Sequence, residues 1–271
     1  MAFLRAIERQ TRVPDLFVLT VEESTDHTAR FAEYVRALTT LNMKVIHTKG
    51  ANRSLGRNIA SAEAIRQDME VLAFTNVCEP NPTWLGLLVK PIEEGSARMT
   101  GGYWFIPTLN TREAAMALLT QFSSSQMDTT KISALNMAIT VEAFEHVGGF
   151  DPKLETSEDT EFVQTAHALL VKSKLTGATV KWRPSTLTVR GAVKAYHQFA
   201  ITDGKARLQS DQYTLTYLAY LMFPLLPVWL LLRIRKVIAA RLLRQVPLSL
   251  VVVFAMDVAR MVGYARGRLG R

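Results

Sequence analysis

Two adjacent carboxylates, Glu158 and Asp159, follow a Gly148-Gly149-Phe150-Asp151 sequence. A carboxylate held beside an alcohol can take its proton as a general base. The same pair also suits the first turn of a solvated helix, because acidic side chains are stabilised at helix N-termini. The residue types alone leave both interpretations open.

Two further polar positions could bind a ligand. The guanidinium of Arg57, beside Asn58, suits a phosphate or a carboxylate, although an arginine on a helix surface is equally ordinary. Asn136 could hydrogen-bond ligand hydroxyl groups, or it could cap a buried turn. These residues need a scaffold that brings distant parts of the chain together.

Alternating apolar segments predict that scaffold. Strands are expected at 15–21, 43–47 and 70–75, and helices at 1–10, 28–40, 54–68 and from Asn81 onward. Strands that alternate with helices indicate an α/β fold with a mostly parallel sheet. Such sheets place ligands at the carboxyl ends of their strands. The loops after Val21, His47 and Thr75 are therefore the expected ligand loops.

Composition excludes several classes of protein. The chain has 271 residues, of which 48% are hydrophobic, so a disordered chain is excluded. A single cysteine, Cys78, excludes a disulfide scaffold or a multi-cysteine zinc site. Residues 233–271 hold nine basic side chains and one acidic one, which accounts for the whole net charge of +8. Because the remainder is neutral, we expect no nucleic-acid partner.

The C-terminal region, 209–271, is expected to associate with a membrane. Residues 213–232 carry no charge over a length that can span a bilayer, and a basic cluster follows. A buried core helix is the alternative. A second apolar segment, 246–265, contains Asp257 and Arg260, so it could be a second span, a re-entrant piece or an in-plane helix. The positive-inside rule places the basic tail on the cytoplasmic side, so a main domain that uses a cytosolic substrate requires the chain to come back as a hairpin or as a shallow in-plane helix pair. We expect an inner or plasma membrane location, with the main domain on the cytoplasmic side.

Four stretches, in order, resemble the family-2 glycosyltransferases of the GT-A fold. The first contains Ser24-Thr25-Asp26 after the first predicted strand, and the second is Gly50 with Leu55-Gly56-Arg57-Asn58. The third runs from Phe74 to Leu85, and the fourth from Asn136 through Gly148–Asp151 to Glu158-Asp159-Thr160. The resemblance implies a GT-A-like, Rossmann-like domain over residues 1–208, flanked by helices and followed by C-terminal membrane helices.

The resemblance also implies an activity. A sugar would pass from a nucleotide-sugar donor to a polysaccharide or lipid-linked acceptor at the membrane, with inversion, in the biosynthesis of cell-envelope polysaccharide. Asp159 matches the position of the base, with Glu158 beside it. The other implied site residues are Glu22, Glu23, Arg57, Asn58 and Asn76 on the donor side, and Asn136, Asp151 and Trp104 on the acceptor side. For Trp104, packing in the core is the alternative.

The metal motif departs from the family pattern. A divalent cation, Mg²⁺ or Mn²⁺, is expected to sit between paired aspartates, but this chain has Asn76-Val77-Cys78 there. Glu79 is the remaining carboxylate of that loop, so Glu79 and Cys78 are the candidate metal ligands. Hard cations prefer oxygen ligands to a thiolate, so weak metal affinity is expected.

The family's first strand is also missing from the pattern, since the chain begins at what resembles the helix after it. We expect that the natural start lies upstream, that another segment fills the gap, or that the chain is a degenerate copy. The last possibility supports an alternative function, a non-catalytic glycosyltransferase-like scaffold in envelope polysaccharide assembly. Nucleotidyl transfer has no support, because no glycine-rich, lysine-bearing phosphate loop follows a strand.

Overall fold

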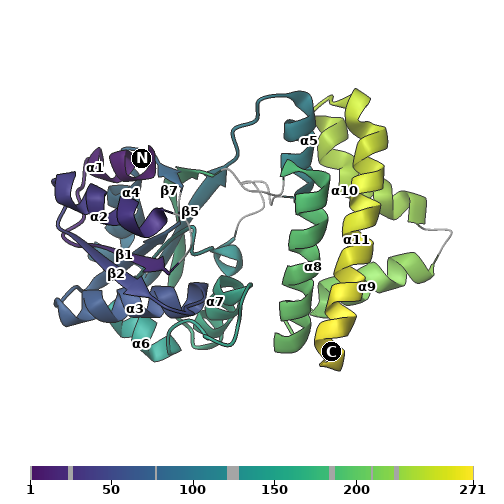
Figure 1. Cartoon of the computed structure of the whole chain (residues 1–271). Helices are drawn as coiled ribbons and strands as arrows, with labels where there is room; N and C mark the ends of the chain where they lie inside the picture. Colours follow the sequence, from purple (N-terminus) through teal and green to yellow (C-terminus); the bar gives the residue numbers. More distant parts are fainter. Residues whose placement is uncertain are drawn as a thin grey trace. The chain divides into compact units, whose positions relative to one another are not determined.

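The chain folds into two compact units, each built from two stretches of sequence. A computed structural model describes residues 2–23, 27–76, 78–120, 128–182, 187–208, 210–222 and 226–270 (Figure 1). The first unit comprises residues 1–105 and 127–182, and the second comprises 106–126 and 183–271. The second unit therefore includes chain before residue 209. The predicted loop Ser24-Thr25-Asp26 and residue Val77 lie outside the described residues.

A small parallel sheet opens the first unit. Strands β1 (Phe17–Glu22) and β2 (Met43–Thr48) pair from Phe17 opposite Met43 to Glu22 opposite Thr48. The flanking helices are α1 (Ala2–Glu8), α2 (Thr28–Leu38) and α3 (Arg53–Arg66). The side chain of Asn52 caps α3 by accepting a hydrogen bond from the Leu55 amide. The end of β1 and the start of α3 are thus fixed close to the loop that follows β2.

The larger sheet has five strands in the order β3-β6-β5-β7-β4. Their bounds are β3 Val71–Thr75, β4 Glu79–Pro80, β5 Met99–Phe105, β6 Asn136–Thr140 and β7 Ser173–Lys181. Only β5 and β7 pair in parallel; the other three pairings are antiparallel. The predicted α/β class is confirmed, and this sheet is mixed rather than mostly parallel.

Helices cover both sheets of the first unit (Figure 1). Apolar side chains fill the space between helices and sheets. The helices are α4 (Trp84–Glu93), α6 (Val141–Val147), α7 (Glu158–Ala168) and the 3-10 turn η2 (Thr129–Lys131). Phe150 packs against Phe74 and Phe162 at ring-centroid distances of 5.4 and 4.6 Å. This aromatic cluster joins the glycine-rich turn to the sheet and to α7.

One edge of the larger sheet collects the loops that could form a site. Strands β3, β5 and β7 run in the same direction, because β3 and β5 are both antiparallel to β6. They end at the edge where β6 begins, with Thr75 opposite Asn136. Thr75 at the end of β3 and Glu79 at the start of β4 both lie at this carboxyl edge.

The second unit is helical. Its helices are α5 (Thr111–Thr120), α8 (Val189–Ala206), α9 (Ser210–Leu221), α10 (Leu226–Ala239) and α11 (Val246–Leu269), with the 3-10 turn η5 (Leu243–Gln245). Helices α8 and α11 cross at glycines: a Cβ on Gly267 would lie 2.1 Å from the Ile201 carbonyl oxygen, and one on Gly263 would lie 2.5 Å from that of His197. Small residues permit this close backbone approach, as they do in many membrane-helix pairs.

A buried carboxylate joins three helices of the second unit. Asp257 of α11 is 0% exposed. It accepts hydrogen bonds from Arg233 at 3.1 Å and from the Trp229 indole at 3.1 Å, both on α10, and from the Tyr220 hydroxyl of α9 at 3.4 Å. The acidic residue within the second apolar segment is therefore an internal partner of the basic cluster.

The predicted span at 213–232 is not one helix in the structure. Helix α9 ends at Leu221 and α10 begins at Leu226, with Pro227 in its first turn, where a proline removes no helical hydrogen bond. Within the described part of the chain, one segment, Leu243–Leu269, is long and apolar enough to cross a membrane. It contains the second predicted apolar segment, 246–265.

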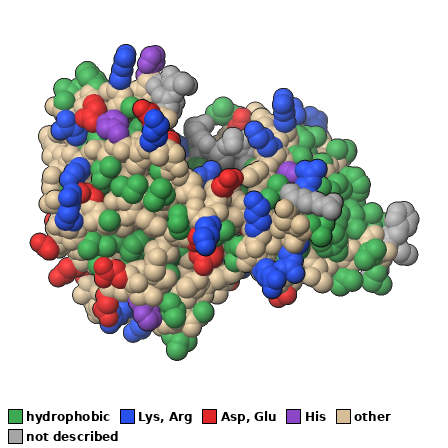
Figure 2. Space-filling model, turned by 60° about the horizontal axis from the view of Figure 1, so that its bottom comes forward, with side chains coloured by type: hydrophobic (Ala, Val, Ile, Leu, Met, Phe, Trp, Pro, Cys, Tyr) green, Lys and Arg blue, Asp and Glu red, His purple; other side chains and the backbone are tan. Residues whose placement is uncertain are grey.

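The second unit exposes many large apolar side chains on α9, α10 and α11, and we call these the apolar surface. Figure 2 shows apolar side chains gathered over this unit, with lysine and arginine side chains beside them. The residues are Leu215, Leu218, Leu221, Met222, Val228, Leu231, Leu232, Ile238, Val251, Phe254, Val262 and Leu269. An apolar area of this extent is unusual on a monomeric soluble protein.

Candidate active site

Helix α3 holds the glycine-rich turn through two hydrogen bonds made by the side-chain amide of Asn58. The Asn58 side chain donates to the Phe150 carbonyl oxygen at 2.7 Å and accepts from the Phe150 amide at 2.9 Å. Gly148 and Gly149 have φ values of 95° and 74°, a region that favours glycine. A Cβ on Gly149 would lie 3.0 Å from the Asn58 oxygen, so the turn and the amide fit closely. Asn58, predicted to bind the donor, thus has a structural function in the turn.

Arg57 and Glu158 form a buried ion pair. The two side chains are 12% and 4% exposed, and their nearest nitrogen and oxygen are 2.5 Å apart. The guanidinium also lies over the Phe150 ring, 5.2 Å from its centroid. Two of the predicted site residues, 101 positions apart in sequence, are therefore brought together. The pair fixes the first residue of α7, and with it the position of Asp159.

Asp159 is held at the carboxyl edge of the larger sheet. Its Oδ2 accepts hydrogen bonds from the Ser133 hydroxyl at 2.6 Å and the Ala134 amide at 3.2 Å, and Oδ1 accepts from the Thr160 amide at 2.9 Å. Each carboxylate oxygen has two acceptor positions. Among the described residues, Oδ2 has both positions filled and Oδ1 has one filled. Asp159 is half-buried, and no described residue fills the second acceptor position of Oδ1.

Ser133 is a site residue that the sequence did not indicate. It lies just before β6, in a turn closed by a 2.9 Å hydrogen bond from the Asn136 amide to the Ser133 carbonyl oxygen. A serine in a short loop carries no motif, and its partner Asp159 is 26 positions away. Only the fold shows that this hydroxyl orients the candidate base.

Glu22, at the end of β1, binds the loop after β2. Its carboxylate accepts from the Thr48 hydroxyl at 2.8 Å and from the amides of Gly50 and Ala51. These hydrogen bonds, the one from Thr48 first, hold the Glu22 pKa below its ordinary value. Glu23 makes an exposed ion pair with Lys49 at 3.7 Å. Of these two predicted donor-side acids, Glu22 shapes the ligand loop through its own hydrogen bonds.

The side chains of Asn76, Cys78 and Glu79 do not form a suitable set of ligands for a divalent cation. Cys78 is 1% exposed, and burial raises the pKa of its thiol to about 11, so it stays protonated at neutral pH. Glu79 is paired with Lys181 at 2.9 Å. Asn76 is exposed and its carbonyl oxygen accepts from the Cys78 amide at 2.6 Å. No group of three or more His, Cys, Asp or Glu side chains that could hold a metal occurs within the described ranges.

Asn136 has a structural role in place of the predicted contact with the acceptor. It is 0% exposed and accepts from the Trp84 indole at 2.8 Å. Its amide nitrogen donates to the carbonyl oxygens of Tyr103 and Ala178, which lie on β5 and β7. Both polar atoms of the Asn136 side chain are hydrogen-bonded within the fold, so this residue links β6 to β5, β7 and α4.

The two remaining acceptor-side candidates lie near the same edge. Trp104, on β5, is half-buried and packs against the core cluster between the sheets and α4. Asp151 accepts from the Lys153 amide at 2.9 Å and closes the turn after Phe150.

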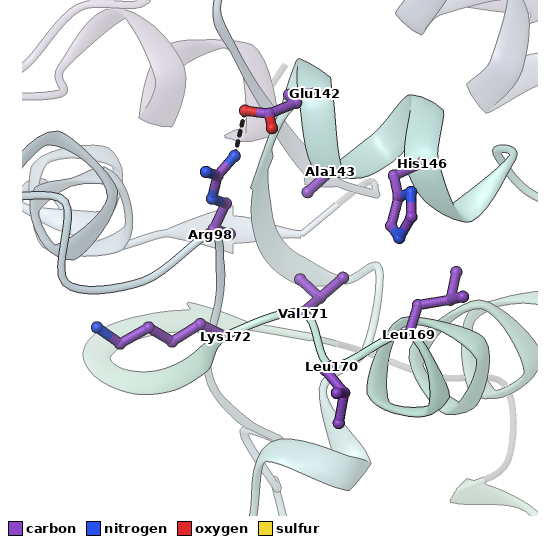
Figure 3. A pocket seen from close by; sticks show the side chains of 8 residues that line it. All are labelled: Arg98, Glu142, Ala143, His146, Leu169, Leu170, Val171 and Lys172. Carbon is purple, nitrogen blue, oxygen red and sulfur yellow. Dashed lines mark hydrogen bonds and ion pairs between the residues drawn. The ribbon is translucent and has the colours of Figure 1, made fainter.

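A pocket, drawn in Figure 3, is lined by residues at the other edge of the larger sheet, where β5 and β7 begin and β6 ends. It is lined by Arg98, Glu142, Ala143, His146, Leu169, Leu170, Val171 and Lys172, which precede β5 and β7 or follow β6. Arg98 and Glu142 form an ion pair across its mouth. None of the predicted site residues lines this pocket.

Comparison with known proteins bears on the fold. No family model matches the sequence, and no curated protein does. Among solved structures, S. aureus TarS 1–349 in complex with UDP matches with a TM-score of 0.51 and 14% identity, over 100% of this chain and 87% of that one. Its complex with UDP-GlcNAc matches with a TM-score of 0.50 and 14% identity, over 99% of this chain and 87% of that one.

A third structure matches more closely in shape. The mannosyltransferase PcManGT from Pyrobaculum calidifontis, in complex with GDP-Man and Mn²⁺, has a TM-score of 0.64 and 12% identity, over 99% of this chain and 82% of that one. At these identities the likeness shows the fold alone. The chain therefore has a glycosyltransferase fold of the GT-A type.

Proposed function

We propose that this chain is an inverting, family-2-like glycosyltransferase that moves a sugar from a nucleoside diphosphate to an acceptor hydroxyl. The observation that carries the proposal is the geometry of Asp159, which is fixed on Oδ2 by Ser133 and Ala134 and keeps an acceptor position on Oδ1. The fold is that of proteins solved with UDP, UDP-GlcNAc and GDP-Man.

The proposed step needs one proton acceptor on the chain. The acceptor hydroxyl gives its proton to Asp159 Oδ1, and its oxygen attacks the anomeric carbon. The bond from that carbon to the diphosphate oxygen breaks, and the nucleoside diphosphate leaves with the electron pair. A single displacement of this kind inverts the anomeric centre, and general-base assistance contributes about 10²–10⁴-fold in rate. Ser133 and the Arg57–Glu158 pair position the base.

The acceptor is proposed to be a polysaccharide or lipid-linked chain at an inner or plasma membrane, with the first unit in the cytoplasm. The apolar surface of the second unit supports this, together with the nine basic residues in 233–271. Helices α9 and α10 have 12 and 14 residues. At a rise of about 1.5 Å per residue they are shorter than a bilayer core of ~30 Å. We therefore propose that they lie at the lipid interface and that α11 is the segment able to insert.

Flotation with anionic phosphatidylglycerol vesicles tests the membrane proposal. The wild-type chain should float with the vesicles, and the double variant Leu218→Asp/Leu221→Asp should float less. Leu170→Asp is the matched control, because Leu170 is 89% exposed but lies in the first unit. Equal flotation of the wild type and the double variant would refute lipid contact by the apolar surface.

A turnover assay tests the proposed activity. The full chain, purified in detergent, is incubated with a panel of UDP- and GDP-sugars and a membrane lipid extract. Release of nucleoside diphosphate, and sugar label in the lipid fraction, should exceed those of an identically purified mock preparation. Absence of turnover with every donor would overturn the proposal. It would favour the alternative, a non-catalytic scaffold in envelope polysaccharide assembly, for which the unsuitable metal donor set is the supporting observation.

A further inference from the structure

The loop that resembles a metal-binding loop carries a fixed ammonium group. Lys181 is the last residue of β7, and it lies directly opposite Glu79 in the antiparallel pairing of β4 with β7. The Lys181 Nζ and the Glu79 carboxylate are 2.9 Å apart, and the side chains are 31% and 39% exposed. The pairing is therefore set by strand register, and solvent still reaches both groups.

This pairing opposes a divalent cation at Glu79. The carboxylate that would ligate the metal already has a positive partner within hydrogen-bond distance, and a second cation there would meet Coulomb repulsion. The neighbouring Cys78 is buried and protonated, and Asn76 offers a neutral amide. The side chains that could ligate a metal at this position are thus unsuited to Mg²⁺ or Mn²⁺.

Lys181 lies at the carboxyl edge of the larger sheet, the edge at which α/β sheets commonly bind ligands. Strand β7 ends at the same carboxyl edge as β3 and β5, and Lys181 there lies opposite Glu79, the first residue of β4. Asp159 is held at the same edge through Ser133, just before β6. A diphosphate at this edge would meet an ammonium group where the resemblance placed a metal.

Resting on the proposed function, we infer that this chain binds its nucleoside diphosphate without a divalent metal and that the Lys181 ammonium neutralises the departing diphosphate. Glu79 holds Lys181 in place and competes with the diphosphate for it. A charge-assisted hydrogen bond between the Lys181 ammonium and the diphosphate would contribute measurably to the free energy of nucleotide binding. The inference assigns to Lys181 a ligand-binding role that its sequence position does not suggest.

Calorimetric titration of the full chain in detergent with UDP and with GDP tests this inference. Each titration is done with excess EDTA and again with Mn²⁺. The Kd should agree within about twofold between the two conditions, and Lys181→Met should weaken binding by about tenfold in both. Lys181→Arg should keep most of the affinity, and Glu79→Gln should tighten binding because it removes the competing carboxylate.

A matched control lies on the same strand. Lys174 is exposed near the other end of β7, about 23 Å away at ~3.3 Å per residue, so Lys174→Met should bind like the wild type. Thermal unfolding of every variant checks that it is folded, and Lys181→Arg separates loss of charge from loss of packing. Wild-type affinity in a folded Lys181→Met variant would overturn the role of Lys181.

The outcomes separate this inference from the proposed function. Binding that occurs only with Mn²⁺, or that Mn²⁺ strengthens more than about tenfold, would overturn metal independence and leave the glycosyltransferase proposal in place. Absence of UDP and GDP binding under both conditions would overturn both. Equal binding with EDTA and Mn²⁺, lost on Lys181→Met, supports the inference.

Discussion

Replacing Arg57 by methionine would leave the Glu158 carboxylate buried without its partner. The two side chains are 12% and 4% exposed, and the guanidinium also covers the Phe150 ring. Removing one member of a buried ion pair destabilises a protein by about 3–5 kcal/mol. The lost cation–π contact adds about 0.5–1 kcal/mol. We therefore expect Arg57→Met to lower the free energy of unfolding of the first unit by about 3.5–6 kcal/mol.

Tryptophan fluorescence suits this measurement, since Trp84, Trp104 and Trp182 lie in the first unit and only Trp229 lies in the second. The expected loss corresponds to a fall in Tm of roughly 7–24 °C. The double variant Arg57→Met/Glu158→Leu should recover much of the loss, because no buried charge remains. Arg36→Met is the control: its ion pair with Glu33 is exposed to solvent, so its removal should lower the free energy of unfolding far less. A loss for Arg57→Met no larger than the control's would refute a buried, stabilising pair.

Three further outcomes follow from the geometry. Cys78, buried with a thiol pKa of about 11, should react with iodoacetamide at pH 8.5 roughly 100-fold more slowly in the folded chain than in denaturant; equal rates would contradict its burial. The pKa of Glu22 is lowered by folding, so its hydrogen bonds stabilise the loop above its ordinary pKa near 4.5 and are lost as pH falls through the lowered value. Thermal unfolding should thus show wild type more stable than Glu22→Gln at pH 7 and the difference disappearing at acid pH; a difference independent of pH would exclude this cause. Gly267→Ala should separate α8 from α11 and destabilise the second unit by about 1–3 kcal/mol in chemical denaturation, whereas a stabilised variant would show that the helices do not approach so closely.

Much of the first unit could be predicted from sequence periodicity. The expected strands at 15–21, 43–47 and 70–75 correspond to β1, β2 and β3, and the expected helix at 54–68 corresponds to α3. Local patterns of apolar residues determine such elements. Pairing order is not local: the antiparallel β6 lies between β3 and β5, and no pattern within β6 indicates its neighbours.

The span at 213–232 shows where composition misleads. Hydropathy counts apolar residues but does not register that Pro227 starts a new helix in the structure, at α10. The segment that does form one long apolar helix contains Asp257. Because of this charge, the sequence alone did not identify the segment as a membrane span. That charge is compensated by Arg233, 24 residues earlier, which only the packing of α10 against α11 reveals.

The sequence indicated Glu158, Asp159 and Arg57 as candidates but did not show which groups they contact. Glu158 and Asp159 lie in the first turn of α7, the position that the helix-start interpretation gave them. Their functions depend on Arg57 and Ser133, which are 101 and 26 residues away. Asn136 was predicted to contact the acceptor, but its side chain hydrogen-bonds inside the fold. An asparagine that links strands and one that binds a ligand look the same in sequence.

Turnover by Asp159→Asn tests the central claim most directly. With a donor that the wild-type chain uses, this variant should bind UDP or GDP normally and lose about 10²–10⁴-fold in kcat, because asparagine cannot take the acceptor proton. Glu161→Gln, on the same first turn of α7 and bonded to Thr165 of its own helix, should keep wild-type kcat. An Asp159→Asn variant that turns over as fast as Glu161→Gln would contradict Asp159 as the base.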